Sequence, residues 1–173
     1  LTELIRHGEN IVGVITAPDK AAGRGRKISQ SAVKKYADLQ GIKTLQPTNL
    51  KEASFLDELA ALNADLQIVV AFRMLPKLVW DMPQLGTFNL HASLLPQYRG
   101  AAPINWAIIN GEIETGVTTF FLNHEIDKGA IIMQEKVAIE PNMNAGALHD
   151  LLANIGSKLV TKTCDAIASN TAN

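Results

Sequence analysis

The sequence lacks the features that mark several common classes of protein. It has a single cysteine, Cys164, in 173 residues, so no internal disulfide can form, and we expect a reducing, cytosolic compartment. No apolar run approaches the roughly 18 residues of a membrane-spanning helix, and the charged first turn predicts no signal peptide. Zinc-ligand spacing, a P-loop and the full GxGxxG spacing are absent, although Gly23-Arg24-Gly25 follows a predicted strand. These absences argue against membrane proteins, zinc proteins and dinucleotide-dependent oxidoreductases.

Length and composition predict one globular domain. Of the 173 residues, 47% are hydrophobic, which is enough for a substantial core. The formal net charge is −1, but residues 1–51 carry nine Lys/Arg against four Asp/Glu. Six of these basic residues lie within sixteen positions: Lys20, Arg24, Arg26, Lys27, Lys34 and Lys35. Such a stretch either binds a phosphate backbone or forms a solvated loop, and charge alone favours the loop.

Apolar, β-branched runs alternate with helical patterns in the first half of the chain. The predicted strands are 11–16, 43–46, 66–72 and 86–91, the predicted helices are 31–40 and 51–63, and 18–27 is a predicted loop. The run 66–72 is continuously apolar, as is typical of a strand buried on both faces of a parallel sheet. The alternation predicts an α/β fold with a mostly parallel sheet flanked by helices.

The second half of the chain has a different pattern. Residues 101–110 predict a helix with Pro103 in its first turn, where proline is tolerated. Residues 117–122 and 130–139 predict two strands joined by a short loop, so we expect an antiparallel pair late in the chain. Asn144 is a candidate N-cap for a long amphipathic helix.

Three polar residues suit an enzyme that holds an oxyanion and moves protons. Asn89 and His91 lie two positions apart on a predicted strand, so they share a face, and the strand ends where ligands of open α/β sheets bind. Asp127 is either a turn residue or a carboxylate that favours the imidazolium form of a nearby histidine. A lone Asn or His after a strand is more often structural, but the two together beside the Ser93–Pro96 turn favour a catalytic site.

Other candidate residues have a simpler alternative. Phe72 and Met74, at the end of the strand 66–72 and just beyond it, form either the floor of a ligand pocket or the edge of the core. Cys164 lies in a helical pattern with no obvious base nearby, which indicates a structural thiol. The remaining histidines are isolated in the sequence and are predicted to lie on the surface or at helix ends: His7, His124 and His149.

Residues 88–111, 114–118 and 126–129 resemble the 10-formyltetrahydrofolate-dependent formyltransferases, whose specific pattern Asn-x-His-x-Ser-Leu-Leu-Pro begins here at Asn89. Residues 98–104 and 18–25 resemble the branch whose acceptor is methionyl initiator tRNA. The resemblance implies a Rossmann-like catalytic domain that transfers the formyl group of 10-formyltetrahydrofolate to the α-amino group of that tRNA. It further implies a cytoplasmic, monomeric enzyme of translation initiation that needs no metal.

The same resemblance assigns roles to individual residues. It implies that the catalytic residues are Asn89, His91 and Asp127. It implies folate contacts from the turn Ser93, Leu94, Leu95 and Pro96, beside which Phe72 and Met74 are the candidate pocket floor. The basic segment would then contact the tRNA acceptor end through Arg24, Arg26 and Lys27.

The sequence departs from the family in four respects. A first strand and a C-terminal β-barrel domain are not found, so we expect residues 1–173 to be a fragment that contains the catalytic domain. Lys128 replaces the usual threonine, and Arg73-Met74 replaces a small apolar pair. Alternative functions are the same chemistry on glycinamide ribonucleotide or an amino-sugar nucleotide, or a non-catalytic RNA-binding module.

Overall fold

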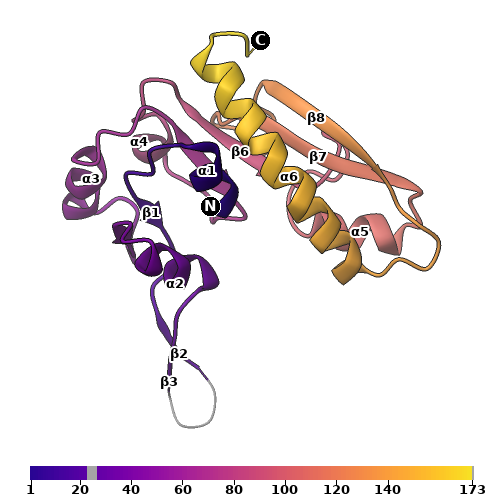
Figure 1. Ribbon diagram of the computed structural model, residues 1–173, viewed down its shortest axis with the longest axis horizontal. Helices are drawn as coiled ribbons and strands as arrows, with labels where there is room; N and C mark the ends of the chain where they lie inside the picture. Colours follow the sequence, from indigo (N-terminus) through magenta and orange to yellow (C-terminus); the bar gives the residue numbers. More distant parts are fainter. Residues whose placement is uncertain (23–26, 173) are drawn as a thin grey trace.

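The structure is a computed structural model that describes residues 1–22 and 27–172 (Figure 1). Its helices and strands are, in chain order, α1 (Thr2–His7), β1 (Val14–Ile15), β2 (Lys20–Ala22), β3 (Lys27–Ser29), α2 (Ala32–Leu39), β4 (Thr44–Leu45), α3 (Ala53–Ala60), β5 (Gln67–Val70), α4 (Lys77–Trp80), β6 (Thr87–His91), α5 (Pro103–Ile109), β7 (Glu114–Phe121), β8 (Ile131–Ala138) and α6 (Ala145–Ala168). The helices and strands predicted between residues 11 and 139 are confirmed, with ends that differ by at most three residues.

Four strands form the main sheet, in the order β5-β6-β7-β8. β5 pairs with β6 in parallel, whereas β6·β7 and β7·β8 are antiparallel. β1 and β4 form a separate parallel pair. The α/β class and the late antiparallel pair are confirmed, but the main sheet is mixed rather than mostly parallel. The residue pattern missed this because a buried apolar strand such as β7 carries no sign of its direction.

The strand predicted to be buried on both faces, 66–72, is only half-buried. β5 lies at one end of the strand order, and Val70 is 56% exposed. The strand that is most deeply buried is β7, whose residues 115–120 are all buried between β6 and β8. Continuous apolar character therefore indicated a strand correctly but misplaced it within the sheet.

Helix α6 covers one face of the main sheet (Figure 1). It begins where the Asn144 side chain accepts a hydrogen bond from the backbone N–H of Ala147, as the sequence predicted. The helix approaches β6 closely, since a Cβ on Gly156 would lie 2.8 Å from Leu90 Cδ2. Successive residues of a strand point to opposite faces, so Asn89 and His91 lie on the face away from α6. No helix of the described residues is both long and apolar enough to span a membrane.

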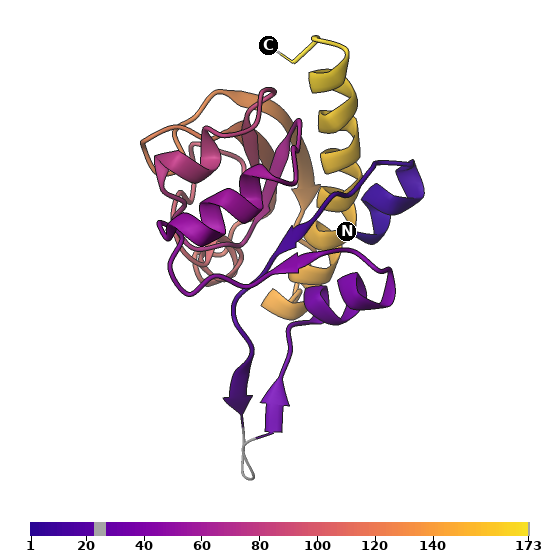
Figure 2. The same ribbon diagram turned by 90° about the vertical axis from the view of Figure 1, so that its left-hand side faces the viewer.

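The segment 18–27, predicted as a loop, carries an antiparallel hairpin instead. Lys20 pairs with Ser29 and Ala22 with Lys27, and the hairpin projects from the rest of the molecule (Figure 2). The prediction was wrong because Gly and basic residues obscured two strands of three residues each. Strands β2 and β3 therefore lie away from the main sheet.

Side chains from several segments fasten the base of this hairpin. The Lys34 ammonium donates to Asp19 Oδ2 and to Gln46 Oε1, each at 2.7 Å. The Gln46 amide donates to Asp19 Oδ1 and to the Ala17 carbonyl oxygen, each at 2.8 Å. Gln30, on the returning side of the hairpin, donates to Asp19 Oδ2 at 3.4 Å. We call these side chains, Asp19, Gln30, Lys34 and Gln46, the hairpin-base network.

Candidate functional site

His91 is the last residue of β6, at the carboxyl end of the parallel pair. Its Nε2 lies 2.8 Å from the carbonyl oxygen of Tyr98, and its Nδ1 lies 3.8 Å from Asp127 Oδ2. The side chains of His91 and Asp127 are only 8% and 14% exposed. The structure therefore brings together two residues that lie far apart in the sequence, as the catalytic hypothesis required.

Asp127 is held in place by the loop that follows the Ser93–Pro96 turn. Its Oδ2 accepts a hydrogen bond from the Gly100 N–H at 2.8 Å, and its own carbonyl oxygen accepts one from Arg99 Nε at 2.9 Å. Asp127 has φ +50, a left-handed conformation that Asp tolerates better than most residues. The carboxylate is thereby aimed at His91 by contacts on both its side chain and its backbone.

Asn89 supplies a buried polar atom that has no partner. It lies two residues before His91 on the same face of β6, and its Oδ1 is one of two buried side-chain N/O atoms of the described residues without a hydrogen bond. A buried amide without a partner costs free energy unless a ligand or water satisfies it. This placement suits an amide that contacts a substrate, and the amide's N–H₂ is the donor that an oxyanion needs.

Thr118, on β7, fixes the Ser93–Pro96 turn to the main sheet. The Thr118 hydroxyl donates to the Ser93 carbonyl oxygen at 2.6 Å and accepts from the Leu95 N–H at 3.1 Å. Gln134 Nε2 lies 2.9 Å from both Thr118 Oγ1 and the Leu95 carbonyl oxygen. Thr118 belongs to a segment that carried the family resemblance, but nothing in the sequence singled out Gln134.

Within the turn itself, the candidate residues have different surroundings. Ser93 is fully buried, and its hydroxyl donates to the Gln97 carbonyl oxygen at 2.6 Å. Its side chain therefore holds the turn. Leu95 is also buried, Leu94 is half-buried and Pro96 is exposed, and the folate contacts of this turn stay a prediction. The Leu95–Pro96 peptide bond is cis.

Two glycines allow backbone to pack closely at this site. A Cβ on Gly116 would lie 2.2 Å from the Glu135 carbonyl oxygen and 2.5 Å from Leu94 Cδ2. A Cβ on Gly129 would lie 1.6 Å from the Phe121 carbonyl oxygen. Both distances are far below van der Waals contact, so these positions require glycine for the turn and for the loop that carries Asp127.

The loop of Asp127 also carries Lys128, one of the departures from the family pattern. Lys128 Nζ pairs with Glu125 at 2.9 Å, and this hydrogen bond lowers the pKa of the Glu125 carboxyl. Both side chains are exposed, so the pair contributes little to stability. The Lys128 side chain thus contacts a neighbour on its own loop rather than His91 or Asp127.

The remaining folate candidates are separated by the structure. Phe72 packs against the core cluster around Phe55, as in the simpler alternative, whereas Met74 is 74% exposed. Between them, Arg73 donates to the Pro47 carbonyl oxygen at 2.7 Å and to the Thr48 carbonyl oxygen at 3.1 Å. Arg73 therefore joins the segment after β4 to the segment after β5.

The predicted tRNA contacts lie on or next to the hairpin. Arg24 and Arg26 lie outside the described residues, and Lys27 begins β3. In the sequence, Arg24 and Arg26 fall between β2 and β3, and the role of all three residues stays a prediction.

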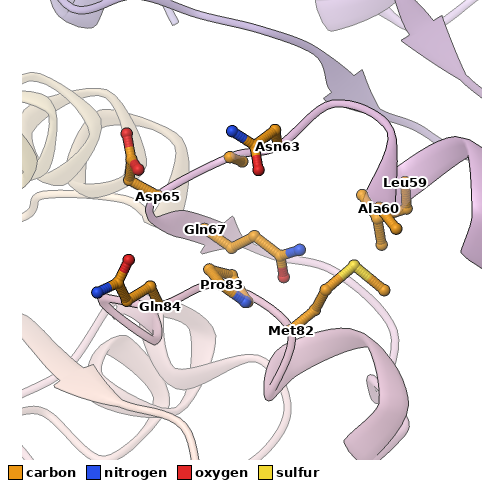
Figure 3. A pocket seen from close by; sticks show the side chains of 9 residues that line it. Leu59, Ala60, Asn63, Asp65, Gln67, Met82, Pro83 and Gln84 are labelled. Carbon is orange, nitrogen blue, oxygen red and sulfur yellow. The ribbon is translucent and has the colours of Figure 1, made fainter.

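Other features of the molecule lie away from these residues. A cavity of about 240 Å³ opens at the amino end of β5, beside Gln67, and is lined by Asn63 and Asp65 among others (Figure 3).

His7 is exposed at the end of α1, as predicted, but it has neighbours in space: its ring nitrogens lie 3.2 Å from Glu9 and 3.3 Å from Asp165. Cys164 is buried, and burial raises the pKa of its thiol to about 12, as suits a structural residue.

Comparison with known protein families matches residues 2–164 to the family described as "Formyl transferase". The chain is 66% identical over 167 residues to a methionyl-tRNA formyltransferase of Flavobacterium johnsoniae, covering 96% of this chain and 53% of that protein. It is 61% identical over 171 residues to a methionyl-tRNA formyltransferase of Bacteroides thetaiotaomicron, covering 99% of this chain and 53% of that protein. The chain thus spans about half the length of these curated relatives.

Solved structures of the same fold are more distant in sequence. A phosphoribosylglycinamide formyltransferase from Anaplasma phagocytophilum superposes with a TM-score of 0.80 at 25% identity, covering 97% of this chain and 80% of that one. One from Streptococcus pneumoniae gives a TM-score of 0.79 at 17% identity, covering 96% and 91%. These likenesses confirm the expected α/β formyltransferase fold.

Proposed function

This chain belongs to the formyl transferase family, and from that premise we propose that it is the catalytic domain of a methionyl-tRNA formyltransferase. The observation that carries the proposal is the buried His91 facing the half-buried Asp127, with Asn89 on the same face of β6 and its Oδ1 buried without a partner. Relatives that are 60–66% identical and bear that name support the choice of methionyl-tRNA as the acceptor. The formyl donor is 10-formyltetrahydrofolate, bound against the Ser93–Pro96 turn.

The first chemical step is attack of the methionyl α-amino group on the formyl carbon. This forms a C–N bond and places negative charge on the formyl oxygen. The Asn89 side-chain N–H₂ donates a hydrogen bond to that oxygen, and one such donor contributes about 10²–10³ in rate.

The second step breaks the bond between the formyl carbon and N10 of the folate. The attacking nitrogen must lose a proton and N10 must gain one. His91 and Asp127 carry this proton from one nitrogen to the other, directly or through a water. The Nδ1 to Oδ2 separation of 3.8 Å is longer than a hydrogen bond, which leaves room for a substrate atom or water to join the pair.

The hairpin is the proposed contact with the tRNA acceptor end. Strands β2 and β3 project from the main sheet (Figure 2), Lys27 begins β3, and Arg24 and Arg26 fall between the two strands in the sequence. Arginine and lysine bind phosphate without regard to sequence, so this contact supplies affinity and orientation rather than selection of the initiator tRNA. Since the acceptor takes part in translation, we place the enzyme in the cytoplasm. We further propose that it is a monomer and needs no metal.

The proposal is tested by measuring formyl transfer from 10-formyltetrahydrofolate with the full gene product and the 173-residue chain side by side. Each is offered methionyl initiator tRNA, glycinamide ribonucleotide and an amino-sugar nucleotide. We expect transfer to the tRNA alone. Transfer to another acceptor overturns the substrate but keeps the chemistry. Salt-sensitive RNA binding with neither folate binding nor transfer by the full gene product overturns the enzyme in favour of an RNA-binding module.

A further inference from the structure

Tyr98 adopts an unfavourable backbone conformation that its side chain holds in place. Its φ of +54 lies in the left-handed region, which an aromatic residue occupies only where its surroundings fix it. The Tyr98 hydroxyl donates to Glu112 Oε1 and accepts from Asn110 Nδ2 at 2.9 Å. Glu112 raises the pKa of the Tyr98 phenol, so the hydroxyl remains a donor. The phenol is thus fastened to the segment that joins α5 to β7.

The same residue places its carbonyl oxygen against the catalytic histidine. The Tyr98 carbonyl oxygen lies 2.8 Å from His91 Nε2. A carbonyl oxygen accepts and never donates, so this contact requires a hydrogen on Nε2. In the neutral ring the unprotonated nitrogen is then Nδ1, which faces Asp127 Oδ2. The proton that His91 gains and loses is therefore the one on Nδ1, on the side of Asp127.

We propose that Tyr98 is a positioning residue whose anchored phenol keeps its carbonyl oxygen on His91 Nε2 and so reserves Nδ1 for proton transfer. The inference rests on the proposed function, in which His91 moves the proton. It explains why an aromatic residue with a hydroxyl lies in a strained turn between the Ser93–Pro96 turn and Gly100. The Tyr98 hydroxyl thus influences His91 without touching it, because it fixes the backbone of Tyr98, whose carbonyl oxygen contacts His91 Nε2.

The test compares Tyr98→Phe with Tyr36→Phe, which removes the hydroxyl of the chain's other tyrosine, on α2. In the full gene product, ¹⁵N NMR of the histidine rings in alkaline solution reports which nitrogen carries the proton. We expect His91 to be protonated on Nε2 in the native protein and in Tyr36→Phe, and to become a mixture of both tautomers in Tyr98→Phe. We also expect Tyr98→Phe to lower kcat about tenfold or more, with KM for either substrate changed less than about twofold.

Variants of the partner distinguish positioning from general damage to the fold. Glu112→Gln keeps an acceptor for the phenol and should preserve the Nε2–H tautomer and kcat, whereas Glu112→Ala should repeat the effect of Tyr98→Phe. Native tautomer and kcat in Tyr98→Phe would overturn the inference while the proposed function survives. Absence of formyl transfer by the native protein would instead overturn the proposed function, and the tautomer measurement would still decide the structural part.

Discussion

The proposed catalytic end of the main sheet and the base of the hairpin are both fixed by hydrogen bonds, but of different kinds. At the proposed catalytic end, His91, Asp127 and the Ser93–Pro96 turn are held mostly by backbone groups and by the buried hydroxyl of Thr118. At the hairpin base, an ion pair between Lys34 and Asp19 is joined by two glutamine amides, and its charged side chains are 16% and 22% exposed.

This difference indicates what each region must do. Backbone groups cannot change rotamer, so they fix atoms to within fractions of an ångström, as proton transfer requires. A partly exposed ion pair is weakened by salt and by acid, and its long side chains allow small rotations. We therefore expect the backbone contacts around His91 and Asp127 to position reacting atoms. We expect the hairpin-base network to set the direction of the β2–β3 hairpin, which we call the arm. The following predictions test this division, beginning with the largest effect.

Asp127→Asn should abolish most activity while leaving the fold intact. Asn tolerates a left-handed conformation, and its side-chain oxygen still accepts the Gly100 N–H, so the loop should remain in place. The loss of the carboxylate removes proton transfer through His91, and kcat should fall by about 10²–10⁴. Single-turnover formyl transfer measures the loss, and circular dichroism checks the fold. Asp57→Asn, on the exposed side of α3, is the control. Near-native activity of Asp127→Asn would remove this carboxylate from the mechanism.

Gly129→Ala should disturb the same loop through its backbone alone. The new Cβ would lie 1.6 Å from the Phe121 carbonyl oxygen, so the loop must move and carry Asp127 with it. We expect kcat to fall by about tenfold to a hundredfold, together with a lower melting temperature. Gly146→Ala is the control, because its Cβ meets only the side chain of Asn144, at 3.3 Å, at the start of α6. Unchanged kinetics in Gly129→Ala would show that the position of this loop is not critical.

Two adjacent buried threonines separate support of the turn from support of the core. Thr118→Val removes the contacts to Ser93 and Leu95 and should destabilise the protein by about 1–3 kcal/mol and raise KM for the folate severalfold. Thr119→Val removes a contact to Thr163 on the opposite face and should destabilise the protein without changing that KM. Denaturant unfolding and steady-state kinetics measure the two effects. Equal changes of KM in both variants would contradict a specific role for Thr118.

The fold was largely predictable from the sequence because its elements follow local patterns. Apolar periodicity located the helices, and the capping residue Asn144 marked the start of α6. Local patterns contain no information on strand direction or order, so the antiparallel β6·β7 pair and the exposed edge of β5 were missed. The β2–β3 hairpin was missed because its strands are too short to show alternation.

The site shows the same division between local and long-range information. Asn89, His91 and Asp127 could be proposed from the sequence because their residue types and the family resemblance both lie in short motifs. Their supports come from distant segments: Gln134 reaches the turn from β8, and Tyr98 is anchored by residues around the end of α5. Only tertiary structure shows that the Ser93 side chain holds the turn rather than pointing toward a ligand. Residue types could therefore suggest the candidate residues, whereas the contacts that hold those residues in place required the structure.

The smallest effect is expected at the hairpin base, from Asp19→Asn. Hydrogen bonds from Lys34 and Gln46 lower the pKa of the Asp19 carboxyl. A lowered pKa means that the ion pair stabilises the native state above the usual carboxyl pKa of about 3.9 and is lost only as the pH falls through the lower native value. Removing the Asp19 charge at neutral pH should loosen the β2–β3 hairpin, just as protonation of Asp19 in acid should loosen it in the native protein. We therefore expect faster amide exchange in β2 and β3, and KM for the tRNA raised a few-fold with kcat unchanged.

Salt and a matched variant complete this test. High salt should weaken the Lys34–Asp19 pair and speed exchange in the native hairpin, but should have little further effect in Asp19→Asn. Asp38→Asn, on the exposed surface of α2, changes the net charge equally and should alter neither exchange nor KM. If both variants raise KM alike, total charge rather than the hairpin-base network governs tRNA binding. If Asp19→Asn lowers kcat instead, the arm and the catalytic end are coupled, and the division between them fails.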